Sequence, residues 1–450
     1  MRLTQTPLPP SATINPMPSL RSLLPILILA AFTLRAADVQ HSYAAVHCGS
    51  LLDVRTGHST RDAVLLIEDG KIRQAGAASS THLAHNETPI DLTHATCLPG
   101  LIDVHDHLTN DASDNGYESL GISVPRETVK GVKNARITLE AGFTTVRNVG
   151  ADGYSDVALR DGIEAGDVPG PRMLVSGPPL GITGGHCDNN LLAPEYHYKD
   201  PGVADGPWAA RARVREVIKY GADLIKVCAS GGVLSKGDLP GAPQYTLEEM
   251  RAIAEEAHKL GRKVAAHAHG TQSIKDAIRA GIDSVEHASL IDDEGIALAK
   301  QAGTFLVFDI YNHDFIMQHG LEFGMLPESI EKERKVGELQ RENFQRAYKA
   351  GVRLAFGTDG GVYPHGENAR QLTLMVKLGM KPLDAIQTAT VNAAELMGWE
   401  HSVGALEPGY FADLIAVDGD PLNDIKLLEH VKFVMKNGEI VKDEFRHVNQ

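Results

Sequence analysis

Histidines at alternate positions in short apolar runs are the first sign of chemistry in this sequence. His105 and His107 close the run LPGLIDVHDH, and His267 and His269 close the run VAAHAH. In a β-strand, residues two apart point to the same face, so the members of each pair would project together. Histidine is the most common metal ligand in proteins, and this chain of 450 residues contains 20. The two pairs therefore predict a metal site.

Three further residues lie in or just after similar apolar runs. Lys226 lies within ADLIKVCAS, His287 ends IDSVEH, and Asp359 follows VRLAFGT. A charged lysine buried beside His and Asp would be costly, unless burial lowers its pKa and leaves a neutral amine. Such an amine can add CO₂ and become a carbamate, an anionic ligand whose two oxygens can bridge two metals. Together these residues offer the N and O ligands that suit Zn²⁺, with an open position for water.

The elements that would position these residues repeat along the chain. Six times, a helical pattern ends at a glycine and a short apolar run follows; glycine is the usual left-handed cap of a helix. In TLEEMRAIAEEAHKLG, Thr246 and Glu249 form a capping box at the start of the helix, and Gly261 ends it. The six glycines are Gly142, Gly221, Gly261, Gly281, Gly303 and Gly351.

Two more apolar runs, at residues 98–107 and 172–177, bring the number of predicted strands to eight. Eight strands that alternate with helices predict a parallel sheet covered by helices, and eight is the number that closes a (β/α)₈ TIM barrel. The barrel would span residues 98–402, and a doubly wound open sheet is the alternative. Because active sites of such barrels lie at the C-terminal ends of the strands, the fold would gather the residues above at one rim.

The segments on either side of the predicted barrel have a different pattern. Residues 38–97 and 403–450 contain short strands and turns, including the hairpin signals Asp69-Gly70 and Asn437-Gly438. We expect the two segments to pair with each other. The predicted fold is therefore α/β, a (β/α)₈ barrel with a small β-sandwich domain built from both chain ends.

The first 37 residues have the pattern of a signal peptide. Residues 23–34 read LLPILILAAFTL, an apolar run that follows Arg21 and precedes the small residues Ala36 and Ala37. The run is too short to span a bilayer but fits the apolar region of a signal peptide; a buried core helix is the alternative. We therefore expect a periplasmic or secreted protein with no stable membrane association after cleavage.

Composition and charge exclude several classes of protein. Hydrophobic residues make up 43% of the chain and charged residues 22%, which is typical of a globular protein rather than a disordered one. The net charge of −15 argues against a protein that holds nucleic acid by its phosphates. We therefore expect no nucleic-acid partner.

The four cysteines are scattered and show no C-x-x-C spacing. This argues against a zinc knuckle and against a fold stapled by several disulfides, and leaves a single disulfide open. Cys187 and Cys228 are interpreted as small packing residues near the site, since no partner base for a thiol nucleophile accompanies them.

The order H-x-H, Lys, His, His and Asp on strands one, four, five, six and eight resembles the binuclear branch of the amidohydrolase superfamily. The resemblance covers roughly residues 40–440 and is closest to the Xaa-Pro dipeptidases (prolidase-like) and to amidases that hydrolyse ochratoxin. It extends to LPGLIDVHDH, TTVRNVG, GITGGH, VAAHAHG, SVEHAS, FGTDGG, TATVNAAELMG and GALEPGYFADL. Family relatives often form homo-oligomers, which the resemblance implies here too.

The resemblance implies two divalent metal ions, most simply Zn²⁺, and a ligand for each of them at a matching position. His105, His107 and Asp359 would hold one metal, His267 and His287 the other, and Lys226 would bridge them as N6-carboxylysine. The implied mechanism is attack by a metal-bridging hydroxide whose proton Asp359 accepts and passes to the leaving nitrogen.

Other positions near the motifs receive different interpretations. His186, in the segment Thr-Gly-Gly-His, matches a family position that contacts substrate, where it would donate to the oxyanion or hold the substrate carboxylate; a loop histidine without a role is the alternative. His269 could contact substrate, support a ligand histidine or pack in the core. Asp106 and Glu286 are interpreted as structural, because each points away from the neighbouring ligand.

One segment departs from the family pattern. Residues 307–310 read VFDI, where relatives often have V-P-T-[LV]. The resemblance therefore does not extend to the shape of the pocket at the seventh strand.

The resemblance implies hydrolysis of an amide bond in N-acyl amino acids or dipeptides with a free C-terminal carboxylate. Xaa-Pro and Xaa-Phe dipeptides are examples, as is the conversion of ochratoxin A to ochratoxin alpha and phenylalanine. Mononuclear deaminases and imidazolonepropionases of the superfamily carry an acid three residues after the fifth-strand histidine, where this chain has Gly270. A lactonase or phosphotriesterase on the same metals is the nearest alternative. A mononuclear deaminase or imidazolonepropionase-like enzyme is the second, and a scaffold without activity is the third.

Overall fold

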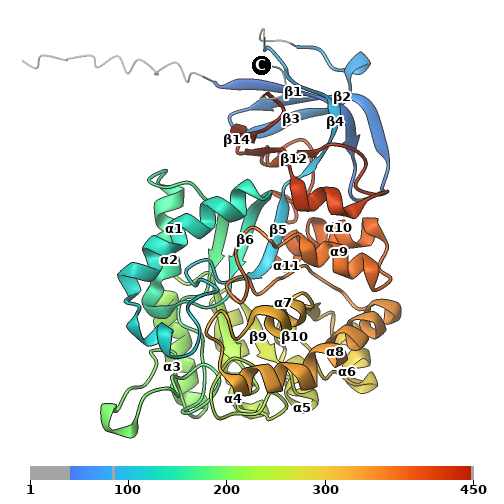
Figure 1. Cartoon of the computed structure of the whole chain (residues 1–450). Helices are drawn as coiled ribbons and strands as arrows, with labels where there is room; N and C mark the ends of the chain where they lie inside the picture. The colour runs from blue at the N-terminus through green and yellow to red at the C-terminus, as the bar shows by residue number, and fades with distance from the viewer. Residues whose placement is uncertain (1–40, 84–86, 447–450) are drawn as a thin grey trace, which may run out of the picture. The chain divides into compact units, whose positions relative to one another are not determined.

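Parallel strands that alternate with helices form the central part of the chain (Figure 1). The computed structural model describes residues 41–83 and 87–446. In these residues the central strands make a three-stranded sheet, in the order β5-β6-β7, and a four-stranded sheet, in the order β11-β10-β9-β8. Their bounds are β5 (Leu101–Asp106), β6 (Phe143–Asn148), β7 (Arg172–Val175), β8 (Leu224–Cys228), β9 (Lys263–Ala268), β10 (Ser284–His287) and β11 (Phe305–Val307).

The predicted eighth strand, at 352–357, does not form a regular strand. Leu354 makes only an isolated parallel bridge to β11. The amide of Phe356 donates to the carbonyl of Thr388, and the carbonyl of Phe356 accepts from the amide of Val104 in β5. The backbone groups of this segment are thus divided among three neighbours, which prevents a continuous ladder with any one of them. The structure shows an α/β fold with parallel sheets, and closure into a barrel stays a prediction.

Helices follow most of the central strands, and their termini show the expected local chemistry. In α4, the side chain of Thr246 accepts from the amide of Glu249 while Glu249 reaches back to Thr246, which confirms the predicted capping box. The α-helices are α1 (Val124–Glu140), α2 (Ser155–Glu164), α3 (Pro207–Lys219), α4 (Leu247–Lys259), α5 (Thr271–Ala280), α6 (Asp293–Ala302), α7 (Asn312–His319), α8 (Pro327–Ala350), α9 (Arg370–Lys377), α10 (Pro382–Thr388) and α11 (Val391–Met397). Short 3-10 helices are η1 (Ala78–Ser80), η2 (Gly116–Gly121), η3 (Asp152–Tyr154), η4 (Pro194–Tyr196) and η5 (Ile425–His430).

Strands from both ends of the chain share one mixed sheet of seven strands, in the order β14-β13-β12-β4-β1-β2-β3. The antiparallel pairing of β12 with β4 joins the two ends, as predicted. The structure gives one hydrogen-bonded sheet, so the predicted sandwich of two sheets is not confirmed. The strands are β1 (Tyr43–Leu52), β2 (Ser59–Glu68), β3 (Lys71–Ala77), β4 (Ile90–Pro99), β12 (Leu414–Val417), β13 (Phe433–Lys436) and β14 (Glu439–Asp443).

The two predicted hairpin turns occur in this sheet. Asp69-Gly70 connects β2 to β3 and Asn437-Gly438 connects β13 to β14. All four residues have positive φ, between 49° and 77°. Two-residue turns of this kind need left-handed backbone at both positions, which Asn, Asp and Gly adopt most easily.

All four cysteines form disulfides, which corrects the interpretation of Cys187 and Cys228 as packing residues. Cys48 of β1 bonds to Cys97 of β4, and Cys187 bonds to Cys228, at sequence separations of 49 and 41. No local spacing signals a pair so far apart in the chain.

The predicted signal peptide, residues 1–37, lies outside the described residues. Among the residues that are described, no helix has the length and apolar character needed to cross a membrane.

Candidate metal centre

The residues singled out in the sequence meet in one cavity. The cavity has a volume of about 530 Å³ and lies where the central strands end. Its polar lining includes all eight of these residues: His105, His107, His186, Lys226, His267, His269, His287 and Asp359.

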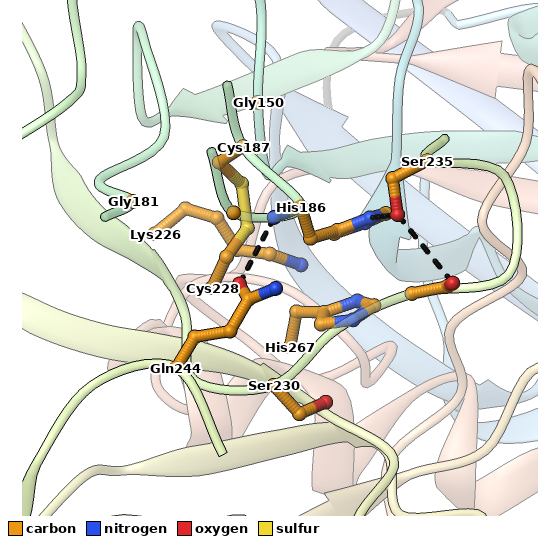
Figure 2. Close-up of a disulfide and its surroundings, with 12 residues drawn as sticks. Gly150, Gly181, His186, Cys187, Lys226, Cys228, Ser230, Ser235, Gln244 and His267 are labelled. Carbon is orange, nitrogen blue, oxygen red and sulfur yellow. Dashed lines mark hydrogen bonds between the residues drawn. A yellow bond between two sulfur atoms is a disulfide. The ribbon is translucent and has the colours of Figure 1, made fainter. Parts of the chain in front are cut away.

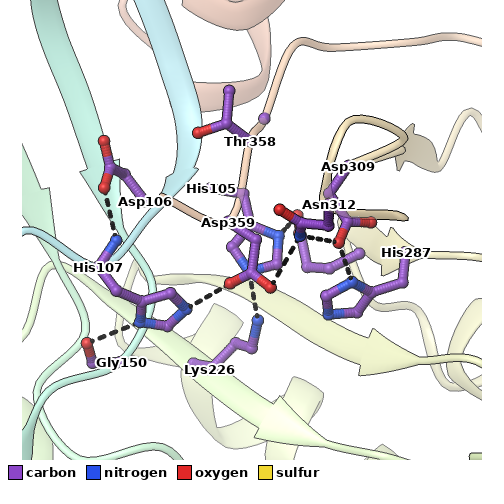
Figure 3. Close-up of polar contacts among 12 residues, drawn as sticks. His105, Asp106, His107, Gly150, Lys226, His287, Asp309, Asn312, Thr358 and Asp359 are labelled. Carbon is purple, nitrogen blue, oxygen red and sulfur yellow. Dashed lines mark hydrogen bonds and ion pairs between the residues drawn. The ribbon is translucent and has the colours of Figure 1, made fainter. Parts of the chain in front are cut away.

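The first group of potential ligands consists of His105, His107 and Asp359 (Figure 3). Their ligand atoms all lie within 4.8 Å of one another. Oδ1 of Asp359 lies 3.3 Å from Nε2 of His105 and 3.1 Å from Nε2 of His107. Nζ of Lys226 lies 3.5 Å from Nε2 of His105, so the lysine borders this group.

The second group consists of His267, His269 and His287, again with ligand atoms within 4.8 Å. The ring of His287 lies 4.6 Å from each of the other two rings, centroid to centroid. It also lies 5.0 Å from the ring of His105. The two groups are therefore neighbours, as a binuclear centre requires.

Two of the predicted ligand histidines are oriented by backbone carbonyls. Nδ1 of His107 lies 3.1 Å from the carbonyl oxygen of Gly150, and Nε2 of His267 lies 3.2 Å from that of Gly231. A nitrogen that faces a carbonyl must carry the proton, which leaves the lone pair on the other ring nitrogen. Metal-binding histidines show this arrangement in most proteins.

The other two are oriented by buried carboxylates. Nδ1 of His105 lies 3.2 Å from Oε2 of Glu286, and Nδ1 of His287 lies 3.0 Å from Oδ2 of Asp309. In both residues the remaining nitrogen, Nε2, is the one left for a metal, as in His107, whereas in His267 it is Nδ1. All four imidazoles thus have a single nitrogen available, and this donor set fits a pair of divalent ions.

Glu286 has a more specific role than the sequence indicated. It points away from its neighbour His287, as expected, but it reaches His105 across the interior. Arg147, itself 2% exposed, donates to Oε1 of Glu286 at 2.8 Å. Although burial opposes ionisation, Arg147 and His105 hold the pKa of Glu286 below its usual value. The residue is therefore an ionised partner that orients His105.

Asp309 was not selected by sequence reasoning, yet it lies in the cavity wall and is 4% exposed. Besides His287, it accepts hydrogen bonds from Nε2 of Gln340 at 2.5 Å and Nδ2 of Asn312 at 2.7 Å. Asn312 also approaches Oδ2 of Asp359, at 3.4 Å. The signal was the acid in the VFDI segment that departs from the family pattern.

Lys226 is 4% exposed, and its buried surroundings make the amine easier to deprotonate than that of an exposed lysine. Burial lowers its pKa to about 8, although the carboxylates of Glu286 and Asp359 act in the opposite direction. A lysine with this pKa has a far larger neutral fraction at physiological pH than an exposed lysine. This property fits the predicted reaction with CO₂.

The backbone is strained at two of the predicted ligands. His287 has φ 68° and Asp359 has φ 58°, and Ala288 next to His287 has φ 49°. Residues other than glycine rarely adopt this region, at a cost of about 1–3 kcal/mol each. Strain of this kind persists where a site requires a particular direction of the side chain.

His186 lies on the loop after β7 and closes one side of the second group. Its ring stacks on that of His267 at 4.0 Å. Its Nδ1 lies 2.8 Å from Oγ of Ser235, whose hydroxyl donates to Asp238 at 2.7 Å. Since that hydroxyl proton is already used, Nδ1–H of His186 is the donor and Nε2 is an acceptor. Desolvation lowers the pKa of His186 to about 4, which favours the neutral form.

His269 lies among the ligands rather than apart from them. Its ring stacks on that of His287 at an interplanar angle of 19°, and its Nδ1 lies 2.8 Å from Oγ of Ser289. Burial is the main cause that lowers its pKa well below the usual value, and repulsion from His287 lowers it further. Asp106, in contrast, accepts from the amide of its neighbour His107 at 2.7 Å and from Asn368 at 3.3 Å, in line with a structural role.

Comparison with known proteins identifies extensive similarity. The model of the amidohydrolase family matches residues 96–441. An ochratoxinase from Aspergillus niger is 33% identical over 432 residues, which cover 90% of this chain and 88% of that protein. A crystal structure of a Xaa-Pro dipeptidase with bound methionine in its active site has a TM-score of 0.83 and 36% identity, covering 89% of this chain and 99% of that one. A prolidase complexed with N-methylphosphonate-L-proline has a TM-score of 0.82 and 31% identity, with coverage of 89% and 100%.

Proposed function

Because this chain belongs to the amidohydrolase family and is a hydrolase that acts on amide bonds, we propose that its substrates are dipeptides or N-acyl amino acids with a free carboxylate. The similarity to an ochratoxinase and to Xaa-Pro dipeptidases supports this class. Proline dipeptides and N-aroyl phenylalanines share one feature, an amide whose nitrogen belongs to an amino acid with a free carboxylate.

The observation that carries the proposal is the pair of adjacent ligand groups with one available nitrogen on each imidazole. His105, His107 and Asp359 would hold one metal, and His267 and His287 the other, most simply as Zn²⁺. When bound, the ions would supply an activated water and polarise the scissile carbonyl. Two groups, together with Gly270 in place of an acid, favour this reaction over that of a mononuclear deaminase.

Lys226 would become the bridging ligand by reaction with CO₂. The lone pair of its neutral Nζ attacks the carbon of CO₂, and the nitrogen proton leaves to water, so that an N6-carboxylysine with one negative charge forms. The lowered pKa supports this step because only the neutral amine has a lone pair to donate.

Asp359 would move the proton during hydrolysis. Its carboxylate faces both His105 and His107, and although burial opposes ionisation, His105 holds its pKa well below the usual value. It would therefore be ionised when the reaction begins, accept a proton from the attacking water and return it to the leaving nitrogen.

His186 would contact the substrate on the side of the second group. Because Nδ1 donates to Ser235, Nε2 is available to accept an N–H of the substrate. The family resemblance implied donation to an oxyanion instead. That role would need a proton on Nε2, so the acceptor role is favoured.

Closure of the (β/α)₈ barrel is part of the same proposal. Isolated parallel bridges support it, because they extend the pairing beyond the two central sheets. They join Leu180 to Val227, Leu306 to Leu354 and Asp106 to Gly360. Export to the periplasm or medium is also proposed, and two disulfides support it because such bonds persist in oxidising compartments.

A substrate panel tests the proposed function. The Zn²⁺-loaded protein is assayed with Xaa-Pro and Xaa-Phe dipeptides, N-acyl amino acids and an N-aroyl phenylalanine, alongside ester, lactone and phosphotriester substrates. We expect the highest kcat/KM for an amide with a free carboxylate, and a large loss when that carboxylate is amidated. Faster turnover of lactones or phosphotriesters would contradict the assignment.

A further inference from the structure

The second disulfide lies in the wall of the candidate metal centre (Figure 2). Cys187 directly follows His186, and Cys228 ends β8, two residues after Lys226. Both cysteines line the cavity. The bond therefore ties the loop that carries His186 to the strand that carries Lys226.

The backbone on either side of His186 and Cys187 lies so close to these residues that it leaves no room for a side chain. A Cβ atom at Gly181 would lie 2.8 Å from Cβ of Cys187, and a Cβ atom at Gly232 would lie 2.2 Å from two atoms of the His186 ring. Neither distance is compatible with normal packing, so only glycine fits on either side. The segment that contains His186 and Cys187 is thus confined between two backbones.

Other attachments of this loop near His186 are few. The amide of His186 donates to Oε1 of Gln244 at 2.9 Å, and its ring contacts Ser235. Between Leu180 and Pro207 the one regular element is the 3-10 helix η4, and residues 193–199 are exposed. The disulfide is the covalent restraint on a loop that has little secondary structure of its own.

We propose that the Cys187–Cys228 disulfide is a positioning element of the active site, which holds His186 against His267 and so sets the shape of the substrate pocket. The inference rests on the proposed function for its catalytic consequence. In this proposal the cysteines act through the position of His186.

The chain provides a matched control. Cys48 and Cys97 form a disulfide of similar span in the seven-stranded sheet and do not line the cavity. We compare the variant Cys187→Ser/Cys228→Ser with the variant Cys48→Ser/Cys97→Ser, each loaded with Zn²⁺. We expect kcat/KM of the first to fall by up to about 10²-fold, as for other small misplacements of a catalytic contact, and the second to stay within about twofold of wild type. Equal losses in the two variants would overturn the proposal.

A double-mutant cycle separates positioning from general stability. If the disulfide acts through His186, its removal in a His186→Ala background should cost no further activity, because the group that it positions is absent. Losses that multiply would overturn the proposal. Metal content is measured in each variant, and a loss of metal that accounts for the loss of activity would also overturn it.

Two measurements keep the test decisive if a variant folds poorly or no substrate is found. Gly232→Ala leaves both disulfides intact but would displace the His186 ring, and it should reproduce the loss of kcat/KM. Amide hydrogen exchange over residues 182–192 should rise on removal of Cys187–Cys228 and not on removal of Cys48–Cys97. If wild-type protein hydrolyses no amide, the proposed function fails, whereas exchange still tests the positioning role: unchanged exchange refutes it.

Discussion

The two disulfides of this chain lie in surroundings of opposite character. Cys48 and Cys97 have no exposed surface and pack in an apolar cluster of the seven-stranded sheet with residues such as Leu92 and Phe433. Cys187 and Cys228 border a cavity whose wall is lined by imidazoles and carboxylates. One bond is embedded in the apolar core of a hydrogen-bonded sheet. The other restrains a loop beside the reacting groups, so the same covalent link can serve stability in one region and chemistry in the other.

The largest difference between the cavity and the sheet is expected for a substitution that abolishes proton transfer and leaves the fold intact. Asp359→Asn keeps the shape and one oxygen of the side chain but loses the group that takes up the proton. We expect kcat to fall by about 10²–10⁴-fold, with metal content largely retained, as measured by steady-state kinetics and elemental analysis. Asp91→Asn on the exposed side of β4 is the control in the sheet and should behave as wild type. Undiminished turnover by Asp359→Asn would refute its role.

Removal of either disulfide should lower the free energy of unfolding by a similar amount, although the two removals should differ in their effect on activity. The partners of the two bonds are separated by 49 and 41 positions in the sequence, and loop-closure entropy predicts about 4 kcal/mol for each bond. Urea unfolding of the two double-serine variants measures this comparison. A much larger loss of unfolding free energy for Cys187→Ser/Cys228→Ser would show that the cavity disulfide also organises the fold. It would then no longer differ from Cys48–Cys97 in serving activity rather than stability.

Asp309 tests whether the cavity wall depends on partners beyond the ligands themselves. Asp309→Asn keeps the size of the side chain but removes the charge that faces Nδ1 of His287. Loss of such a partner typically costs about 10–100-fold in metal affinity or activity. Competition with a chromophoric chelator gives the affinity for Zn²⁺. Asp62→Asn, which alters the exposed partner of His47 in the sheet, is the matched control; equal affinities in the two variants would refute the role of Asp309.

The smallest expected effect is the pH dependence of carbamate formation on Lys226 in the metal-free protein. Burial lowers its pKa to about 8, so the amine is mostly protonated near about pH 7 and mostly neutral near about pH 9. At a fixed partial pressure of ¹³CO₂, the carbamate signal in the ¹³C spectrum should therefore rise across this interval. Lys226→Met should lack the signal. A carbamate that forms only above about pH 10, as for an exposed lysine, would contradict the assignment.

Much of the site could be predicted from strand periodicity. His105, Lys226 and His267 lie on or at the end of short buried strands, and alternation within a strand determines which face a side chain takes. The turns at Asp69-Gly70 and Asn437-Gly438 were also predictable, because their conformation depends on the residues of the turn itself. Such features are local, and a few neighbouring residues contain the information for them.

Other features could not be predicted in this way. The VFDI segment marks Asp309 as unusual but does not give its role, which arises from contact with His287 and Gln340 on different elements. The segment after Gly351 has the composition of a strand, yet its hydrogen bonds are divided among three neighbours. In both cases the deciding partners are distant in sequence.

The sequence by itself determined which side chains could bind metal, the order in which the strands present them, and the family to which the chain is similar. The tertiary structure alone decided which nitrogen of each imidazole is available, which cysteines pair, and what holds His186. The physical reason is that backbone propensity and alternation act over a few residues. Hydrogen-bond partners, burial and disulfides depend on distances that are set only when segments from the whole chain pack together.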